Sequence, residues 1–231
     1  MKTLQKTIPI IATKSLSKSF FDGNERLPIF ENINFQIELK ETVAITGCSG
    51  SGKSTFLNVV SGLEKPTSGS LFWNGRKVFS NQDHLFTKLR GQILGFVFQS
   101  FYLIPELDAL ENVRIAQKIL GKNSLEDRKK AREVIDQVGL SHREKHLGSQ
   151  LSGGERQRIA IARAIVNSPK ILLADEPTGN LDQNSAESIL DLLFSLNKNN
   201  GTSLLLVTHN QQFAKECQRH LAMEPEGLVK L

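Results

Sequence analysis

Cysteine is scarce in this chain of 231 residues, which contains two, Cys48 and Cys217. Two cysteines cannot build a disulfide framework, and these two do not have the spacing of metal ligands. Long hydrophobic runs are also missing, because no stretch approaches the roughly 18 consecutive apolar residues of a membrane-spanning helix. The apolar patch at residues 8–12 is too short for a secretory signal peptide and lacks a convincing cleavage site. We therefore expect a globular protein of the cytosol.

Neither a strong charge imbalance nor a low-complexity segment is present. The 29 Lys and Arg residues exceed the 24 Asp and Glu residues by five, and the isoelectric point is about 9.2. A positive charge suits nucleic acid, an anionic membrane surface or ATP itself. The basic residues are scattered, however, and no basic stripe is interleaved with aromatic residues. We therefore favour a solvated surface with a modest excess of lysine, and we expect no nucleic-acid partner.

A glycine-rich loop within residues 43–60 organises the rest of the chain. An apolar run precedes the loop, a helical pattern follows it, and the loop sequence GCSGSGKS fits the P-loop pattern G-x-x-x-x-G-K-[ST]. Glycines let backbone N–H groups approach phosphate oxygens, and the following helix adds the positive end of its dipole. The alternative, a plain glycine-rich turn, does not require this strand and helix context. The predicted phosphate-binding residues are Gly47, Cys48, Ser49, Gly50, Ser51, Gly52, Lys53 and Ser54.

Strand patterns surround this loop. Residues 29–37 alternate apolar and polar side chains with the period of a half-buried strand. Residues 71–79 hold Asn74-Gly75 between apolar flanks, which is the strongest short hairpin signal. Together with residues 11–21, these segments predict an antiparallel β layer. Three apolar runs predict further strands, the last two buried on both faces: residues 93–98, 171–174 and 204–207.

Helical patterns fill the middle of the chain without a strand of their own. They cover residues 106–120, 124–139 and 151–168. We expect a helical subdomain over residues 96–167, inserted into a core made of residues 1–95 and 168–231. Because strands and helices alternate elsewhere, the core sheet is expected to be mostly parallel. The fold class is thus α/β, a P-loop nucleoside triphosphatase with an N-terminal antiparallel β layer, in a single domain over residues 1–231.

Ligands on parallel sheets bind at the carboxyl ends of the strands. Five candidate residues fall at such ends: Gly47, Gln99, Asp175, Glu176 and His209. Asp175 can hold Mg²⁺ across from the Ser54 hydroxyl, and the Gln99 amide oxygen can also ligate Mg²⁺. Strand alternation would point Glu176 the opposite way from Asp175, toward an attacking water that it can deprotonate. The alternatives are a helix cap at Asp175 and ordinary loop residues at the other positions.

The sequence LSGGE at residues 151–155 predicts a second anion site. A serine followed three residues later by glutamate is a capping box at a helix N-terminus. The same exposed N–H groups and closely approachable glycines can bind a phosphate. This site lies about a hundred residues after the P-loop, so we expect it to serve a nucleotide bound to a partner subunit. Its residues are Ser152, Gly153, Gly154 and Glu155.

The chain resembles the ATP-binding subunits of ABC transporters over nearly its whole length. The family motifs come in the family order and roughly at its spacing: GCSGSGKST at 47–55, Gln99, LSGGERQRIAIARA at 151–164, ILLADEP at 171–177, GNLD at 179–182 and His209. LSGGE is specific to this family among P-loop proteins. The resemblance implies an ATPase that uses ATP and Mg²⁺, sits peripherally on the cytoplasmic face of the bacterial inner membrane and drives integral membrane permease subunits.

The resemblance also implies a role for each motif. Thr55 joins the P-loop in cradling the phosphates, and Gln99 senses the γ-phosphate and the membrane partner. Glu176 is the general base and His209 the switch histidine. Residues 179–182 and 152–155 face a second copy of the chain in a head-to-tail dimer that encloses ATP.

The adenine ring is implied to stack on an aromatic side chain near the N-terminus. Phe20 stands at that place, where many relatives have tyrosine, and Phe21 lies beside it. The sequence leaves open which of the two rings stacks on adenine.

A narrower resemblance points to the bacterial lipoprotein-releasing ATPases of the Lol system, carried by ENINFQI, FVFQSFYLIPELDALENV, LSGGERQRIAIARA and DEPTGNLD. The macrolide-exporter and cell-division ATPases are close to this branch and share GNLD. Lipoprotein release, drug export and a division-type signalling complex that moves no substrate thus stay open. A ribosome- or nucleic-acid-associated ATPase is disfavoured because such relatives usually carry two cassettes or a coiled-coil insertion.

Overall fold

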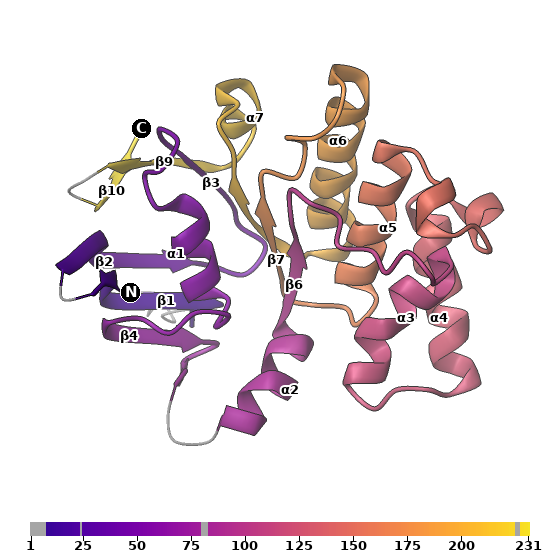
Figure 1. Ribbon diagram of the computed structural model, residues 1–231, viewed down its shortest axis with the longest axis horizontal. Helices are drawn as coiled ribbons and strands as arrows, with labels where there is room; N and C mark the ends of the chain where they lie inside the picture. The colour runs from indigo at the N-terminus through magenta and orange to yellow at the C-terminus, as the bar shows by residue number, and fades with distance from the viewer. Residues whose placement is uncertain (1–7, 24, 80–82, 225–226) are drawn as a thin grey trace, which may run out of the picture.

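Two β-sheets and two groups of helices make up the protein in a computed structural model that describes residues 8–23, 25–79, 83–224 and 227–231 (Figure 1). One sheet is antiparallel and has the order β2-β1-β4-β5. Its strands are β1 (Ile11–Asp22), β2 (Glu25–Ile37), β4 (Ser68–Trp73) and β5 (Arg76–Lys77). Asn74 and Gly75 join β4 to β5 with φ values of 47° and 76°, as the predicted hairpin requires.

The second sheet has the order β10-β9-β3-β8-β7-β6, and all of its pairs except β10-β9 are parallel. Its strands are β3 (Thr42–Thr46), β6 (Leu94–Val97), β7 (Ile171–Asp175), β8 (Ser203–Val207), β9 (Arg219–Glu224) and β10 (Gly227–Lys230). β3, β7 and β8 are buried almost throughout, which explains their continuous apolar sequences. The predicted antiparallel layer and mostly parallel core sheet are both confirmed.

Helices cover the parallel sheet and form a group of their own beside it. α1 (Lys53–Val60), α2 (Asp83–Ile93), α6 (Gln183–Asn200) and α7 (Gln211–Lys215) accompany the core. The separate group holds α3 (Ala109–Ile119), α4 (Leu125–Gln137) and α5 (Gly153–Ile165), with the 3₁₀ turns Ser141–Arg143 and Gly148–Gln150. In Figure 1, α3 and α4 lie on the side away from the antiparallel layer, and β6 and β7 run between the two. The boundaries of the helical subdomain stay a prediction.

Helix starts follow the capping residues. Ser124 and Ser152 cap α4 and α5 with reciprocal hydrogen bonds to Asp127 and Glu155. α3 begins at residue 109, three residues later than predicted, because the Asp108 carboxylate accepts a hydrogen bond from the Glu111 N–H at 2.7 Å. The sequence analysis did not predict α2, α7, β9 or β10.

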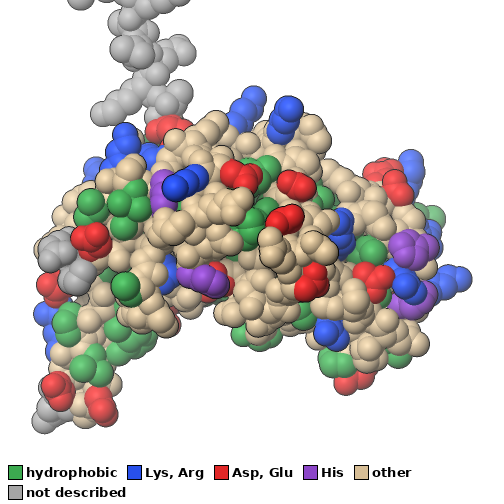
Figure 2. Space-filling view, turned by 90° about the horizontal axis from the view of Figure 1, so that it is seen from above, with side chains coloured by type: hydrophobic (Ala, Val, Ile, Leu, Met, Phe, Trp, Pro, Cys, Tyr) green, Lys and Arg blue, Asp and Glu red, His purple; other side chains and the backbone are tan. Residues whose placement is uncertain are grey.

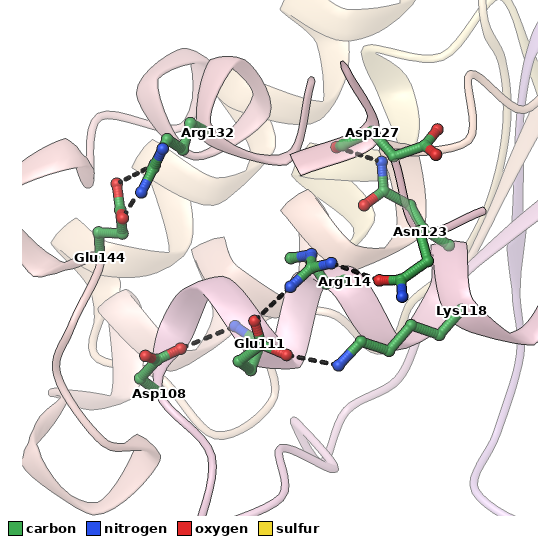
Figure 3. A network of polar contacts seen from close by, with 9 residues as sticks. Asp108, Glu111, Arg114, Lys118, Asn123, Asp127, Arg132 and Glu144 are labelled. Carbon is green, nitrogen blue, oxygen red and sulfur yellow. Dashed lines mark hydrogen bonds and ion pairs between the residues drawn. The ribbon is translucent and has the colours of Figure 1, made fainter. Parts of the chain in front are cut away.

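A polar network stiffens the helical group (Figure 3). The Glu111 carboxylate accepts hydrogen bonds from Arg114 at 2.6 Å and Lys118 at 2.5 Å, and these contacts keep the pKa of Glu111 below its usual value. Arg114 is 7% exposed and also donates to the Asn123 side chain at 2.6 Å, just before α4. The network therefore fixes the turn between α3 and α4.

Apolar side chains fill both faces of the parallel sheet. On one face, the Phe56 ring of α1 meets Phe30 and Phe35 of β2 edge to face, and buried Trp73 donates from its indole to the Val60 carbonyl at 2.9 Å. On the other face, α6 and the helical group enclose a second cluster. The P-loop helix is thus held between the two sheets.

Gly95 of β6 permits a close approach to α5. A Cβ atom at Gly95 would lie 2.5 Å from the Ala164 carbonyl oxygen and 2.7 Å from the Leu172 side chain. We expect Gly95→Ala to lower the free energy of unfolding by about 1–3 kcal/mol in urea titrations, because strand and helix must separate. Gly148→Ala is the control, since its Cβ would meet Leu103 at an ordinary 3.6 Å. Equal losses in both variants would contradict this explanation.

Candidate active site

The P-loop connects β3 to α1 at the carboxyl end of the parallel sheet. Gly47, Gly50 and Gly52 have φ values of 151°, 79° and 92°, in the region that favours glycine. A Cβ at Gly47 would also lie 2.7 Å from the Met223 carbonyl oxygen of β9. The loop and the start of α1 border a small cavity together with Ile29 of β2. The glycines of the motif are therefore required by backbone shape and by close packing.

The Lys53 ammonium lies inside the curve of this loop. It donates hydrogen bonds to the carbonyl oxygens of Gly47 at 2.9 Å and Cys48 at 2.7 Å, and its side chain is almost fully buried. The predicted residues Ser49, Ser51 and Thr55 belong to the same continuous turn and first helical residues. The arrangement offers backbone N–H groups and one compact positive charge to a polyphosphate.

Ser54 and Asp175 meet across the sheet. The Ser54 hydroxyl donates to the Asp175 carboxylate at 3.0 Å, although β8 separates the strands that precede them. Burial raises the pKa of Asp175, an effect that Ser54 opposes and the neighbouring Glu176 charge reinforces. The pair offers oxygen atoms alone, which is the donor set that Mg²⁺ prefers, so these residues fit the predicted metal.

Glu176 and His209 form a second contact at the same edge. The His209 Nδ1 atom lies 2.9 Å from the Glu176 carboxylate, whose side chain is 15% exposed against 74% for the imidazole. β7 ends at Asp175, and Glu176 has a φ of 44°, so the predicted strand alternation is wrong as the cause of its direction. Its N–H donates to the Val207 carbonyl at 2.9 Å, and this bond holds the unusual backbone in place.

Gln99 faces the segment that follows Glu176. Its side-chain nitrogen lies 3.5 Å from the Asn180 side-chain oxygen, and Asn180 donates to the Gln99 carbonyl at 3.1 Å. A Cβ at Gly179 would lie 2.7 Å from the Gln99 amide nitrogen. Within the described residues, Gln99 makes no hydrogen bond to Ser54 or Asp175, and its role as a metal ligand stays a prediction.

Residues 152–155 form a separate site at the start of α5. The Ser152 hydroxyl accepts from the Glu155 N–H at 3.2 Å, and the Glu155 carboxylate accepts from the Ser152 N–H at 2.8 Å. Arg143 donates to the same carboxylate at 2.9 Å, a partner that sequence reasoning missed. The Ser152 N–H and Arg143 lower the pKa of Glu155. Ser152, Gly154 and Glu155 border a cleft with the start of α6, away from the P-loop.

Phe20 and Phe21 stand on β1 with exposed rings, 41% for Phe20 and 67% for Phe21. The Lys18 ammonium lies 4.6 Å from the centroid of the Phe20 ring. This cation covers one side of Phe20 and leaves the rest of its surface partly open, whereas among the described residues no cation lies over the Phe21 ring. The choice between them as the adenine-stacking residue stays a prediction.

Charged residues of both signs are interspersed over the face seen in Figure 2, without a large basic patch. This distribution agrees with the solvated-surface interpretation of the net charge of +5. None of the helices in the described part of the chain has the length and apolar character needed to cross a membrane.

The ABC transporter family model matches residues 30–179. This chain belongs to the ABC transporter family. The lipoprotein-releasing system ATP-binding protein LolD of Idiomarina loihiensis is 47% identical to this chain over 213 residues, 92% of this chain and 93% of that protein. The uncharacterized ABC transporter ATP-binding protein YbbA of Escherichia coli is 45% identical over 214 residues, 93% of this chain and 94% of YbbA.

Among solved structures, a dimer of the ABC transporter cassette MJ0796 has a TM-score of 0.86 and 40% identity, covering 94% of this chain and 96% of that one. The same cassette is also known in a post-hydrolysis state bound to ADP and Pi. These similarities confirm the predicted fold, the family and the ATPase activity of this ABC cassette. The roles of single residues stay predictions.

The raised pKa of Asp175 sets the sign of a stability test. Without nucleotide and Mg²⁺, the buried carboxylate destabilises the fold wherever it is ionised, so Asp175→Asn should raise the melting temperature at pH 8. The gain should shrink as the pH falls below the raised pKa of Asp175, where both side chains are neutral. Asp182→Asn is the control, because the Ser185 N–H lowers the pKa of Asp182 and its replacement should bring no gain. Thermal melts of the parent and of both variants at several pH values test this expectation. A gain in melting temperature for Asp175→Asn that does not change with pH would contradict a raised pKa for Asp175.

Proposed function

We propose that the protein is the ATP-hydrolysing subunit of a bacterial lipoprotein-releasing ABC transporter, working on the cytoplasmic face of the inner membrane. LolD proteins of several bacteria, 42–47% identical to this chain over most of their length, support this assignment. The observation that carries the activity is the placement of Glu176 and His209 beside the Ser54–Asp175 pair and the P-loop.

ATP binding begins with its phosphates in the P-loop. The loop N–H groups and the start of α1 receive the phosphate oxygens, and Lys53 exchanges its carbonyl partners for phosphate oxygens. Ser54 and Asp175, with Gln99 after a movement of its side chain, would hold Mg²⁺, which neutralises phosphate charge when bound. Phe20 or Phe21 stacks on the adenine ring.

Hydrolysis needs a base close to the attacking water. Glu176 accepts the proton of that water as its oxygen attacks the γ-phosphorus and the bond to the β-phosphate oxygen breaks, releasing ADP and phosphate. His209 holds the carboxylate in place through Nδ1 and presents its exposed ring to a γ-phosphate oxygen. The hydrogen bond from the Glu176 N–H to the Val207 carbonyl holds the backbone from which this side chain extends.

A second copy of the chain completes the site. Residues 152–155 of one copy would close over ATP held by the P-loop of the other, using N–H groups at the start of α5. Arg143 offsets the charge of Glu155 and so weakens its repulsion of a triphosphate. The dimer would close on two ATP molecules and open again after hydrolysis, and this cycle would drive the permease.

A groove of about 560 Å³ offers a seat for the permease. It lies between the core and the helical group, and its lining is mainly apolar, including Phe96 and the exposed Ile119. Arg90 and Arg163 border it, so we assign the groove to a short amphipathic helix with acidic residues from a cytoplasmic loop of the permease. Arg163 donates to the Tyr102 carbonyl, close to Gln99, which connects the groove to the nucleotide.

Glu176→Gln tests the catalytic assignment. We expect ATP binding to persist and hydrolysis to fall by about 10²–10⁴-fold, since the amide cannot accept a proton. The variant should accumulate as an ATP-bound dimer in size-exclusion chromatography. Glu187→Gln, an exposed carboxylate on α6, should behave like the parent. Turnover near the parent rate in Glu176→Gln would remove Glu176 from the role of base.

Ile119→Asp tests the groove. The added carboxylate should reduce recovery of the permease and its lipoprotein from detergent-solubilised membranes by more than about tenfold, as loss of a buried anchor does. ATP binding should be unchanged. Leu125→Asp is the matched control, because Leu125 is 88% exposed at the start of α4 and does not line the groove. Full recovery of the permease with Ile119→Asp would refute this docking site. If the parent chain recovers a membrane protein without lipoprotein, lipoprotein release is refuted.

A further inference from the structure

A single buried side chain joins α5 to both segments that carry the hydrolysis residues. Gln157 of α5 is 0% exposed and lies five residues after Ser152. Its amide nitrogen donates to the Phe98 carbonyl at 3.2 Å and to the Pro177 carbonyl at 2.6 Å. Phe98 directly precedes Gln99, and Pro177 directly follows Glu176.

Both donor hydrogens of the Gln157 amide are used in this way, one for each segment. Its side-chain oxygen, by contrast, is buried without a hydrogen-bond partner among the described residues. Burying an unpaired amide oxygen costs free energy, so stability alone gives a poor reason for a glutamine here. The two donated bonds are what an apolar residue of the same size would lack.

The two segments also contact each other. Asn180 and Gln99 exchange side-chain and backbone contacts, and Gly179 packs directly against the Gln99 amide. A displacement of α5 that pulls on the Phe98 and Pro177 carbonyls therefore moves both segments as one body. Close-packed interiors transmit such shifts rather than absorbing them.

We infer that Gln157 is a positioning residue that transmits the engagement of the α5 N-terminus to Gln99 and Glu176. The inference rests on the proposed function, in which residues 152–155 contact the ATP of a second copy. When that contact moves α5, the Gln157 amide carries the movement to the base in its own copy. Hydrolysis in one site thereby depends on ATP in the other.

Gln117 supplies a matched control inside the same molecule. It lies on α3, is 1% exposed, donates from its amide nitrogen to the Asp127 carbonyl at 2.8 Å and also has a buried unpaired oxygen. Its hydrogen-bond partner Asp127 is drawn in Figure 3, where none of the labelled residues is a hydrolysis residue. Replacing either glutamine by methionine thus removes a comparable buried amide at similar volume.

The test compares Gln157→Met with Gln117→Met in the full chain, with ATP and Mg²⁺. Both variants should lose thermal stability, and Gln117→Met should lose less, because it gives up one donated hydrogen bond and Gln157→Met gives up two. Gln157→Met should lower kcat by about 10–100-fold, because a small misplacement of catalytic groups costs that much, with KM for ATP unchanged within about twofold. It should also abolish the cooperativity of the ATP dependence, whereas Gln117→Met should keep parent kcat and cooperativity.

Parent-like kcat and cooperativity in Gln157→Met would overturn the inference. A fall in kcat/KM that comes entirely from a higher KM for ATP, with kcat unchanged, would overturn it as well. If Gln157→Met fails to fold, Gln157→Asn asks the same question, because it keeps the amide but shortens its reach by one methylene. Glu176→Gln separates the two levels of the argument. If that variant hydrolyses ATP normally, Glu176 is not the base, and the inference fails together with that assignment. If Glu176→Gln is inactive while Gln157→Met is normal, the inference alone fails.

Discussion

The register between β3, β8 and β7 is the constraint on which the site depends. Ile45 pairs with Val207, and Val207 pairs with Asp175, so the three strands end level with one another. The Glu176 N–H extends this ladder by one further bond to Val207. Because of this register, the P-loop, the two carboxylates and His209 emerge at one edge of the sheet. A slip of one residue would move the side chains of the slipped strand to the opposite face of the sheet and separate the P-loop, the carboxylates and His209.

The helical group contributes what a parallel sheet cannot provide by itself, a second helix N-terminus at a distance from the first. Its internal polar network, centred on Glu111 and Arg114, connects α3 to the residue just before the Ser124 cap of α4. α5 belongs to this group through its start and to the core through its end. The contacts of Arg163 and Gln157 attach the same helix to the backbone on either side of Gln99. Under the proposed function, this one helix would contact the nucleotide of the partner subunit and line the permease groove, and it donates hydrogen bonds to the residues next to Gln99 and Glu176.

Much of this architecture could be predicted from the sequence because its signals are local. The alternation at residues 29–37, the Asn74-Gly75 turn and the capping box at Ser152 each correspond to one element in the structure. The predicted strand ends put Asp175, Glu176 and His209 at one edge of the sheet, because the carboxyl ends of parallel strands lie at the same edge. Other features depend on contacts between distant segments. The turn of Glu176 rests on a hydrogen bond to β8, and the partners Arg143 and Gln157 become recognisable only when the helices are packed. β9 and β10 gain their strand character from pairing with β3 and with each other.

The close approach of Gly95 to Ala164 fixes α5 against β6 near the C-terminal end of the helix. β6 contacts the helix near Ala164, whereas the start of the helix at Ser152 borders the cleft that it shares with α6. Any rotation about that contact displaces each residue in proportion to its distance along the axis. Gln157 is seven residues from Ala164 and Ser152 is twelve, so at a constant rise per residue about 0.6 of the movement at Ser152 reaches Gln157. In such a rotation the displacement at Gln157 would be smaller than that at Ser152, and the force on the backbone next to Glu176 would be larger by the inverse ratio.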